Sequence, residues 1–153
     1  MWIPTPLGPL WLEVSPFGVR RLEPVLFLRG EEARGSLARA VRERVEAYFA
    51  GERPNFLDLP LDYAGFSPAR VAVYERVRRI PYGKTESYGR LARELGLAPR
   101  AVGAALRACP FFLLVPAHRV IHADGRLGGF QGQEGLKRWL LAFEGALDLH
   151  PDR

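Results

Sequence analysis

Helix start and stop signals divide the second half of this chain into short helices, and they constrain its fold more than any other feature. Ser67 and Pro68 form a helix start, because the serine can cap free N–H groups and the proline suits the first helical position. Pro81 cannot continue a helix, so this one should end near Arg79. The sequence therefore predicts a helix over 68–79.

Two shorter helices follow. Ser87 can cap a helix over 88–95, which Gly96 ends because glycine readily adopts the left-handed conformation found after helices. Pro99 opens a further helix over 100–108. Two short helices joined by a turn that contains glycine are typical of a helix-turn-helix, a motif that enters a groove of DNA.

The first part of the chain has a different pattern. Residues 7–29 predict a hairpin or meander, since turns with glycine and proline separate short apolar runs. Apolar side chains at helical spacing predict a helix over 36–50. The segment 52–66 is broken by proline and glycine, so we expect two lobes, residues 1–65 and 66–153.

The end of the chain predicts a strand over 111–115, a turn over 116–122, a glycine-rich loop and a last helix over 134–144. The apolar residues expected on the inward face of that helix are Leu136, Trp139, Leu140 and Phe143. We therefore expect an α/β fold, with a small N-terminal sheet and one helix beside a mainly helical lobe with a short strand pair.

The positive charge of the chain lies in its second part. Residues 1–65 carry 8 arginines and 9 acidic side chains, a net charge of −1, whereas residues 66–153 carry 14 lysines and arginines and 8 acidic side chains, a net charge of +6. A lobe that meets nucleic acid has such an excess, although a solvated basic surface has it too. No apolar run is long enough to span a membrane, and the single cysteine fits a reducing cytosol.

Three familiar ligand motifs are incomplete. Gly83-Lys84-Thr85 ends like a phosphate-binding loop, but Arg78 stands where its first glycine belongs. No two glycines are two residues apart, as a dinucleotide fingerprint requires. His118 and His122 have the spacing of a zinc-binding helix, but Arg119 replaces its glutamate and the segment predicts strand and turn. We expect no cofactor and no metal site.

The turn after residue 115 could present a reactive side chain. It reads Pro116-Ala117-His118-Arg119, and the residue before the histidine is an alanine, which has no reactive group. Glu144 lies at the edge of the inward face of the last helix, where an unpaired carboxylate is costly, so we expect His118 to be its partner. A structural pair and a catalytic relay both predict this contact.

Cys109 is the one thiol of the chain, and with His118 it could form a nucleophile and its base. It lies, however, on an apolar helical stripe with Val102 and Leu106. The sequence therefore favours a small buried hydrophobic residue.

Several segments resemble, in order, the motifs of the O6-alkylguanine-DNA alkyltransferase family. They are IPYGKTESYGRLA, PRAVGAALRACP, VPAHRVIHADGRLGGFQG and KRWLLAFEG. TPLGPLWLEV and VEAYFAGERPNFLDLPLDYAGFSPARVAVYERVRRIPYGKT resemble that family's N-terminal lobe and linker, so the resemblance spans nearly the whole chain. It implies a ribonuclease-H-like N-terminal sheet and a helix-turn-helix lobe that binds DNA.

In that family a cysteine in Pro-Cys-His-Arg irreversibly takes the alkyl group from a flipped guanine, activated by the histidine, a water and a glutamate. Here His118 and Glu144 match the relay, Ala117 occupies the position of the nucleophile, and Cys109 replaces an asparagine of the family. The pattern is similar to the alkyltransferase-like proteins, in which another residue replaces the cysteine. It implies a protein that is not an enzyme.

The resemblance also implies a set of DNA-binding residues. Arg100 matches the arginine that fills the gap left by the extruded base, and Tyr88 matches the tyrosine that drives the phosphate of the flipped nucleotide around. Small residues allow the helix to approach the minor-groove backbone closely. The full set expected at DNA is Tyr88, Arg100, Ala101, Gly103, Ala104, Arg107 and Arg119.

A second implied set lines the pocket for the flipped base. The carbonyls of Ala117 and Val120 can accept from the guanine amino group, and a backbone N–H near Gln131 can donate to O6. The missing cysteine side chain leaves more room for the alkyl group, so we expect bulky O6 adducts to be tolerated. The full set is Leu106, Ala117, Val120, Leu127, Gly128, Phe130, Gln131 and Gly132.

The implied function is a non-enzymatic sensor that flips O6-alkylguanine out of double-stranded DNA and flags it for nucleotide excision repair through a damage-recognition protein. We expect a monomer in the cytoplasm, associated with the nucleoid. Two other functions stay open. One is an alkyltransferase, with an engineered loss of its cysteine or with transfer through Cys109. The other is a helix-turn-helix transcription regulator that prefers an undamaged, palindromic site.

Overall fold

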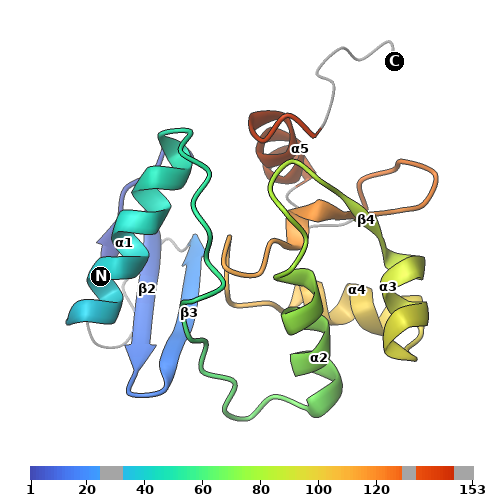
Figure 1. Ribbon diagram of the computed structural model, residues 1–153, viewed down its shortest axis with the longest axis horizontal. Coiled ribbons are helices and arrows are strands. Elements are labelled where there is room, and N and C mark those ends of the chain that lie inside the picture. Colours follow the sequence, from blue (N-terminus) through green and yellow to red (C-terminus); the bar gives the residue numbers. More distant parts are fainter. Residues whose placement is uncertain (25–32, 129–133, 147–153) are drawn as a thin grey trace. The chain divides into compact units, whose positions relative to one another are not determined.

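The computed structural model describes residues 1–24, 33–128 and 134–146, which form a mixed α/β protein with two small sheets and five α-helices (Figure 1). The predicted α/β class is confirmed. The chain divides into two compact units, which are Met1–Gly65 with Pro110–Leu114, and Phe66–Cys109 with Val115–Arg153.

The first unit is a three-stranded antiparallel sheet with one helix against it (Figure 1). Its strands β1 (Trp2–Ile3), β2 (Leu10–Ser15) and β3 (Gly18–Pro24) are neighbours in chain order, and β2 and β3 form the predicted hairpin. Helix α1 (Ser36–Phe49) packs against β2. The buried face of α1 comprises Ala38, Val41, Val45 and Tyr48, as its apolar spacing predicts.

Residues Pro110–Leu114 also belong to the first unit. The Leu22 N–H donates to the Pro110 carbonyl (2.7 Å), and the Phe112 N–H donates to the Leu22 carbonyl (2.8 Å). The chain then turns at Leu113, whose φ is 67°. The predicted strand over 111–115 is therefore wrong, because docking against β3 buries this apolar run without making it a strand.

The second unit begins with three helices whose starts lie where the capping residues predict. They are α2 (Pro68–Val77), α3 (Tyr88–Leu95) and α4 (Pro99–Arg107). The hydroxyls of Ser67 and Ser87 each accept a hydrogen bond from the N–H three residues later, at 3.2 and 3.1 Å. The three helices pack on one another.

A two-stranded parallel sheet completes this unit. Strand β4 (Glu86–Ser87), directly before α3, pairs with β5 (Val120–Ile121), which follows the short 3-10 turn η1 (Ala117–Arg119). Because Ser87 is opposite Ile121, the next residues along both strands are brought close together. Helix α5 (Glu134–Phe143) packs against η1. Within the described ranges no helix has the length and apolar character that a membrane span requires.

Candidate nucleic-acid interface

The turn η1 holds the residue that stands where a nucleophile is expected. Ala117 begins η1, and its N–H donates to the Val115 carbonyl at 2.7 Å. Its methyl side chain offers no atom that could attack an alkyl group. The turn therefore presents no reactive group at position 117.

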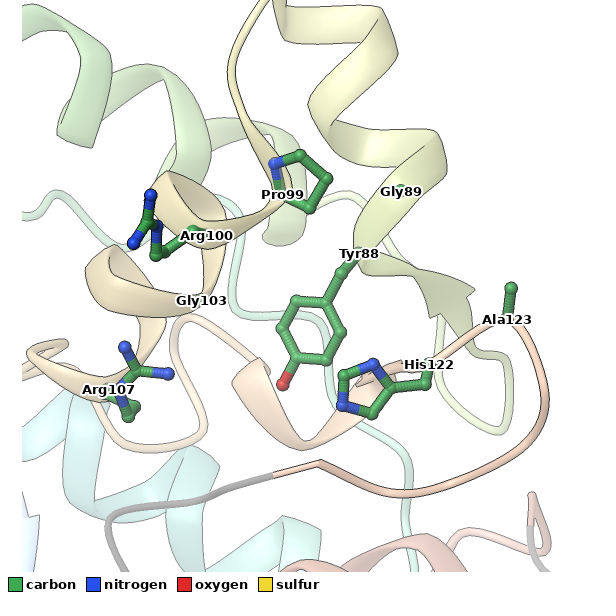
Figure 2. Close-up of a pocket in the computed structure, with 8 residues that line it drawn as sticks. All are labelled: Tyr88, Gly89, Pro99, Arg100, Gly103, Arg107, His122 and Ala123. Carbon is green, nitrogen blue, oxygen red and sulfur yellow. The ribbon is translucent and has the colours of Figure 1, made fainter.

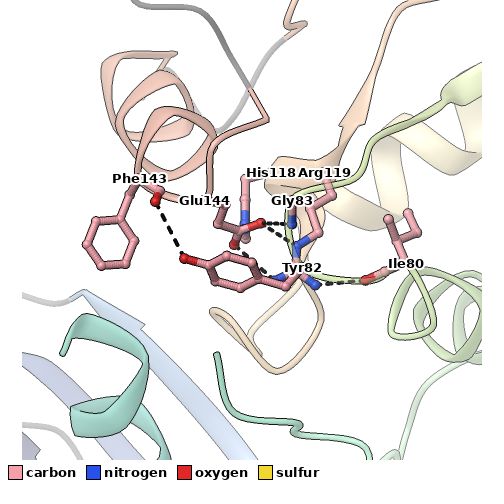
Figure 3. A network of polar contacts seen from close by, with 7 residues as sticks. All are labelled: Ile80, Tyr82, Gly83, His118, Arg119, Phe143 and Glu144. Atoms are coloured by element: carbon pink, nitrogen blue, oxygen red, sulfur yellow. Dashed lines mark hydrogen bonds and ion pairs between the residues drawn. The ribbon is translucent and has the colours of Figure 1, made fainter. Parts of the chain in front are cut away.

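Glu144, just after α5, accepts hydrogen bonds from three neighbours (Figure 3). His118 Nε2 lies 2.7 Å from Glu144 Oε2, which confirms the predicted contact. The Arg119 guanidinium donates to both carboxylate oxygens, at 2.8 and 2.9 Å, and the Gly83 N–H donates to Oε1 at 3.2 Å. We call these four residues the Glu144 cluster.

Burial and hydrogen bonding set the charges of this cluster. Burial alone would raise the pKa of Glu144, but the bonds from His118 and Arg119 outweigh it and hold that pKa far below its usual range. Burial lowers the pKa of His118, so the ring is neutral at pH 7. Because an ionised carboxylate can only accept, the imidazole proton lies on Nε2 and Nδ1 is left as an acceptor. The cluster could take up a proton at Nδ1, but Ala117 offers none.

Arg119, which we expected at DNA, is only 8% exposed. Its third donor bonds to the Ile80 carbonyl at 2.7 Å, and its guanidinium lies 5.7 Å from the centre of the Tyr82 ring. The expectation of a DNA contact is therefore wrong for this residue, since its donors are used inside the protein. Arg119 instead joins η1 to the end of α5 and to the segment after α2.

Helix α4 presents an exposed face that is small in its middle and basic at both ends. Arg100, Ala101, Ala104 and Arg107 are exposed, whereas Val102, Ala105 and Leu106 are buried. Residues at i, i+1, i+4 and i+7 share one side of a helix. The short side chains expected to approach a nucleic-acid backbone thus face outward.

A pocket of about 370 Å³ opens beside this face (Figure 2). We call it the Tyr88 pocket. It brings together four residues of the predicted DNA-binding set, Tyr88, Arg100, Gly103 and Arg107. Three of the eight residues that line it are basic or can become so, and none of the eight is acidic. The complete lining is Tyr88, Gly89, Pro99, Arg100, Gly103, Arg107, His122 and Ala123.

Sequence reasoning missed Lys137, whose side chain is fully buried. Its ammonium donates to the Val120 carbonyl at 2.6 Å and to the Tyr88 hydroxyl at 3.2 Å. Lys137, Leu140, Leu141 and Glu144 form the buried face of α5 and the residue that follows it, at i, i+3, i+4 and i+7. Extending the apolar stripe back by one turn from Leu141 would have found the lysine.

Trp139, expected to face inward, is 36% exposed. Its ring stacks on that of Phe143 at 5.0 Å, so the two aromatic side chains lie beside the buried face of α5 rather than on it. The predicted inward face is therefore partly wrong. Lys137 occupies that face because its donors find partners there.

Gly128 of the predicted base pocket lies against two rings. Its φ is 75°, and a β-carbon there would lie 3.0 Å from His122 Nε2 and 3.1 Å from Tyr88 Cε2. Glycine is therefore required both for the backbone conformation and for the close approach. Gly128, a residue of the predicted base pocket, thus lies directly against the Tyr88 ring.

Other members of the predicted base pocket are placed as follows. Leu106 and Val120 are buried, while Leu127 is half-buried. The carbonyls of Ala117 and Val120 already accept one hydrogen bond each, from the Val120 N–H and from Lys137, and a carbonyl oxygen has a second lone pair. The predicted Phe130, Gln131 and Gly132 lie outside the described residues.

Cys109 is half-buried rather than fully buried. Helix α4 ends at Arg107, so Cys109 no longer continues the buried stripe of Val102 and Leu106. Across residues 1–24, 33–128 and 134–146, no group of three or more histidine, cysteine or acidic side chains could hold a metal ion.

Comparisons with known proteins agree with this geometry. Residues 68–146 match the family described as 6-O-methylguanine DNA methyltransferase, DNA binding domain. A DNA base-flipping protein of Thermus thermophilus is 82% identical over 147 residues, which are 96% of this chain and 100% of that one. A methylated-DNA–protein-cysteine methyltransferase of Methanosarcina acetivorans is 35% identical over 153 residues, which are 93% of this chain and 95% of that one.

The structure of the chain is also similar to a solved structure with a related sequence. The crystal structure of Mycobacterium tuberculosis OGT in complex with DNA is 36% identical, with a TM-score of 0.81, and the match covers 94% of this chain and 90% of that one. Sequence and structure together show that this chain belongs to the 6-O-methylguanine DNA methyltransferase family.

Proposed function

We propose that this protein is a non-enzymatic DNA damage sensor, which binds O6-alkylguanine in double-stranded DNA by flipping the nucleotide out of the helix. The observation that carries the proposal is Ala117, a methyl group at the position of the nucleophile, in a site whose remaining parts are intact. The 82% identical relative is named a DNA base-flipping protein, which supports flipping without transfer.

The persistence of the relay does not argue for catalysis. Removing Glu144 would leave His118 and Arg119 buried without their acceptor, and such groups are costly. Selection for stability is therefore enough to keep the Glu144 cluster. The methyl group of Ala117 takes no part in the hydrogen bonds of this cluster, so we expect an alanine there to cost little stability.

Binding would use α3 and α4 as a helix-turn-helix, with α4 in the minor groove. The small exposed residues Ala101 and Ala104 permit close approach, and Arg100 at the start of the helix would fill the gap left by the flipped base. Tyr88, at the start of α3, would contact the phosphate of that nucleotide. In this proposal residues 66–153 bind the DNA, and the sheet of residues 1–65 is a ribonuclease-H-like lobe.

Discrimination would come from the cost of flipping. O6-alkylguanine lacks the N1 proton of guanine and pairs poorly, so it leaves the stack more readily than an intact base, whose extrusion costs about a few kcal/mol. The methyl of Ala117 leaves more space than a cysteine side chain. We therefore expect large O6 adducts to bind as well as the methyl adduct.

A sensor that leaves the lesion in place is useful only if another protein recognises the complex and starts repair. We propose that the bound, flipped site recruits a damage-recognition protein of nucleotide excision repair. The protein would act as a monomer in the cytoplasm, associated with the nucleoid, where its DNA ligand lies. The support for this step is chemical, since no repair follows from binding alone.

The test uses matched duplexes with and without O6-methylguanine, followed by mass spectrometry of the protein. We expect tighter binding to the lesion and an unchanged protein mass. A methyl group found on Cys109 would show alkyl transfer through the half-buried thiol instead. Equal affinity for the two duplexes, with preference for one undamaged palindromic sequence, would show a transcription regulator.

A further inference from the structure

We propose that His122 is a phosphate-binding residue of the DNA interface, which contacts a phosphodiester in the Tyr88 pocket together with Arg107. This inference rests on the proposed function, because it assigns a residue to the same interface. It rests on three features of the described residues, which are the charge of the pocket, the free imidazole of His122 and the position of the Arg107 guanidinium.

The Tyr88 pocket is suited to an anion. Arg100 and Arg107 approach it from α4, and His122 approaches it from the segment after β5 (Figure 2). No carboxylate is among the eight residues of its lining. A phosphodiester is the anion that a DNA-binding protein meets most often, and most contacts of such proteins go to phosphate and sugar.

The imidazole of His122 is held in place but chemically unused. Its ring centre lies 5.1 Å from that of Tyr88, at an angle of 46°, and Gly128 packs against both rings. Among the described residues, neither ring nitrogen of His122 takes part in a hydrogen bond. A donor that is fixed in position and lines an open, basic pocket is ready for a ligand.

The carboxylate of Asp124 interacts with the charge of His122, but its hydrogen bonds go to Arg126. Asp124, two residues later, bonds through its carboxylate to the N–H and the guanidinium of Arg126, at 3.0 and 2.7 Å. The Lys137 ammonium, near the Tyr88 hydroxyl, donates to that hydroxyl and to the Val120 carbonyl. The lining of the pocket thus contains two arginines and no carboxylate.

Gly103 allows Arg107 to complete the site. A β-carbon at position 103 would lie 3.3 Å from an Nη of Arg107, so the guanidinium folds back over the glycine, within the lining of the pocket. Arg107 and Tyr88 line the same pocket, and the charge of Arg107 opposes the rise that burial causes in the pKa of Tyr88 (Figure 2). Arg107 and His122 thus flank Tyr88.

The first experiment compares His122→Ala and His122→Phe in binding to a lesion duplex over a range of salt. We expect both variants to bind at least about tenfold more weakly than the wild type, as for one hydrogen bond to a charged group, and to lose at most about one unit of salt slope. The phenylalanine keeps a ring against Tyr88 and Gly128, so wild-type affinity in His122→Phe would show that packing is the role of His122 and would overturn the proposal.

The control is Arg126→Ala, which removes a full charge from the same loop but outside the pocket. We expect a smaller loss than for His122→Ala. An equal or larger loss would mean that the general field of the loop, and not a local contact, is measured, and this too would overturn the proposal. Thermal unfolding of each variant checks that the folded state is retained.

The second experiment replaces single phosphates around the flipped position by neutral methylphosphonates. One position should weaken wild-type binding by at least about tenfold and have no further effect in His122→Ala, because the contact is already lost. Additive effects at every position would overturn the proposal. The coupling between His122→Ala and a methylphosphonate can also be measured on undamaged DNA. If the wild type binds lesion and undamaged duplexes equally, the proposed function is refuted, whatever the result for His122.

Discussion

The Glu144 cluster and the Tyr88 pocket both contain charged side chains of the second unit. They differ in whether an acidic partner for these charges lies among their own residues. In the cluster, the carboxylate of Glu144 accepts from Gly83, His118 and Arg119, and all its charge is balanced inside the protein. In the pocket, two arginines and a histidine line an open cavity without an acidic neighbour in the lining. The cluster thus contains the acidic partner of its cations, whereas the lining of the pocket contains none.

The difference separates residues kept for folding from residues kept for binding. The family resemblance assigns His118 and Glu144 to a catalytic relay and Arg119 to a DNA contact, yet the geometry accounts for all three as a buried network. Arg100 and Arg107 are exposed beside a pocket with no acidic residue in its lining, an arrangement that suits a polyanion. The predictions below test this separation in order of decreasing effect.

Glu144→Ala should have the largest effect, because it leaves the Arg119 guanidinium buried without its carboxylate. We expect the free energy of unfolding to fall by about 3–5 kcal/mol, measured by chemical denaturation. Asp124→Ala removes an exposed acid from the pair with Arg126 and should leave stability unchanged within error. Similar stabilities of the two variants would contradict the structural role of the cluster.

Arg100→Ala and Tyr88→Ala should each weaken binding to a lesion duplex by about 2 kcal/mol, roughly thirtyfold, as for a residue at the centre of an interface. Their stability should change much less than that of Glu144→Ala. Arg138→Ala, an exposed arginine of α5 outside the pocket, serves as the matched loss of charge. If all three variants lose the same affinity, the pocket is not the binding site.

The protein should lose stability as pH falls through the range in which an unfolded histidine takes up a proton, near about 6.5. Burial lowers the pKa of His118, so the unfolded chain binds more protons than the native one below that pH and unfolding becomes easier. Glu144, with its lowered pKa, adds a further loss below about pH 4.3, where unfolded carboxylates protonate. His118→Gln should flatten the curve between about pH 7 and 5, and an equally steep curve would show that other groups cause it.

Ala117→Cys should have the smallest effect, namely no efficient alkyl transfer. The new thiol would lie beside a neutral His118, but by the resemblance Cys109 still stands in place of an asparagine near the end of the recognition helix. The measurement is transfer of labelled methyl from O6-methylguanine DNA to the protein. Rapid stoichiometric transfer would show that Ala117 alone separates sensing from catalysis.

Local signals predicted the helices well. Ser67, Ser87 and Pro99 each mark a helix start within one residue, and Gly96, with a φ of 68°, ends α3 as expected. Caps and left-handed glycines act within a few residues of themselves, so their effect can be read without knowing the rest of the molecule. The His118–Glu144 contact was also predictable, because a carboxylate on an inward-facing stripe needs a partner.

Burial and contacts between residues far apart in the sequence were harder to predict. Residues 111–115 have the composition of a strand, but docking on Leu22 makes them a bridge and a turn. From the sequence, Arg119 and Lys137 would be expected on the surface, but both are buried. Arg119 donates to Glu144 and to the Ile80 carbonyl, and Lys137 donates to the Val120 carbonyl. His122 gained its place beside Tyr88 from the pairing of two-residue strands, for which the sequence carries no strong signal.

The sequence alone thus establishes where the helices begin and end, and that residue 117 is an alanine with no reactive group, because these depend on single residues and their near neighbours. Which cations are enclosed and which stay open to a ligand depends on donors and acceptors far apart in sequence. Folding alone brings Glu144 to Arg119 and His122 to Tyr88. The difference between the Glu144 cluster and the Tyr88 pocket therefore depends on the tertiary structure.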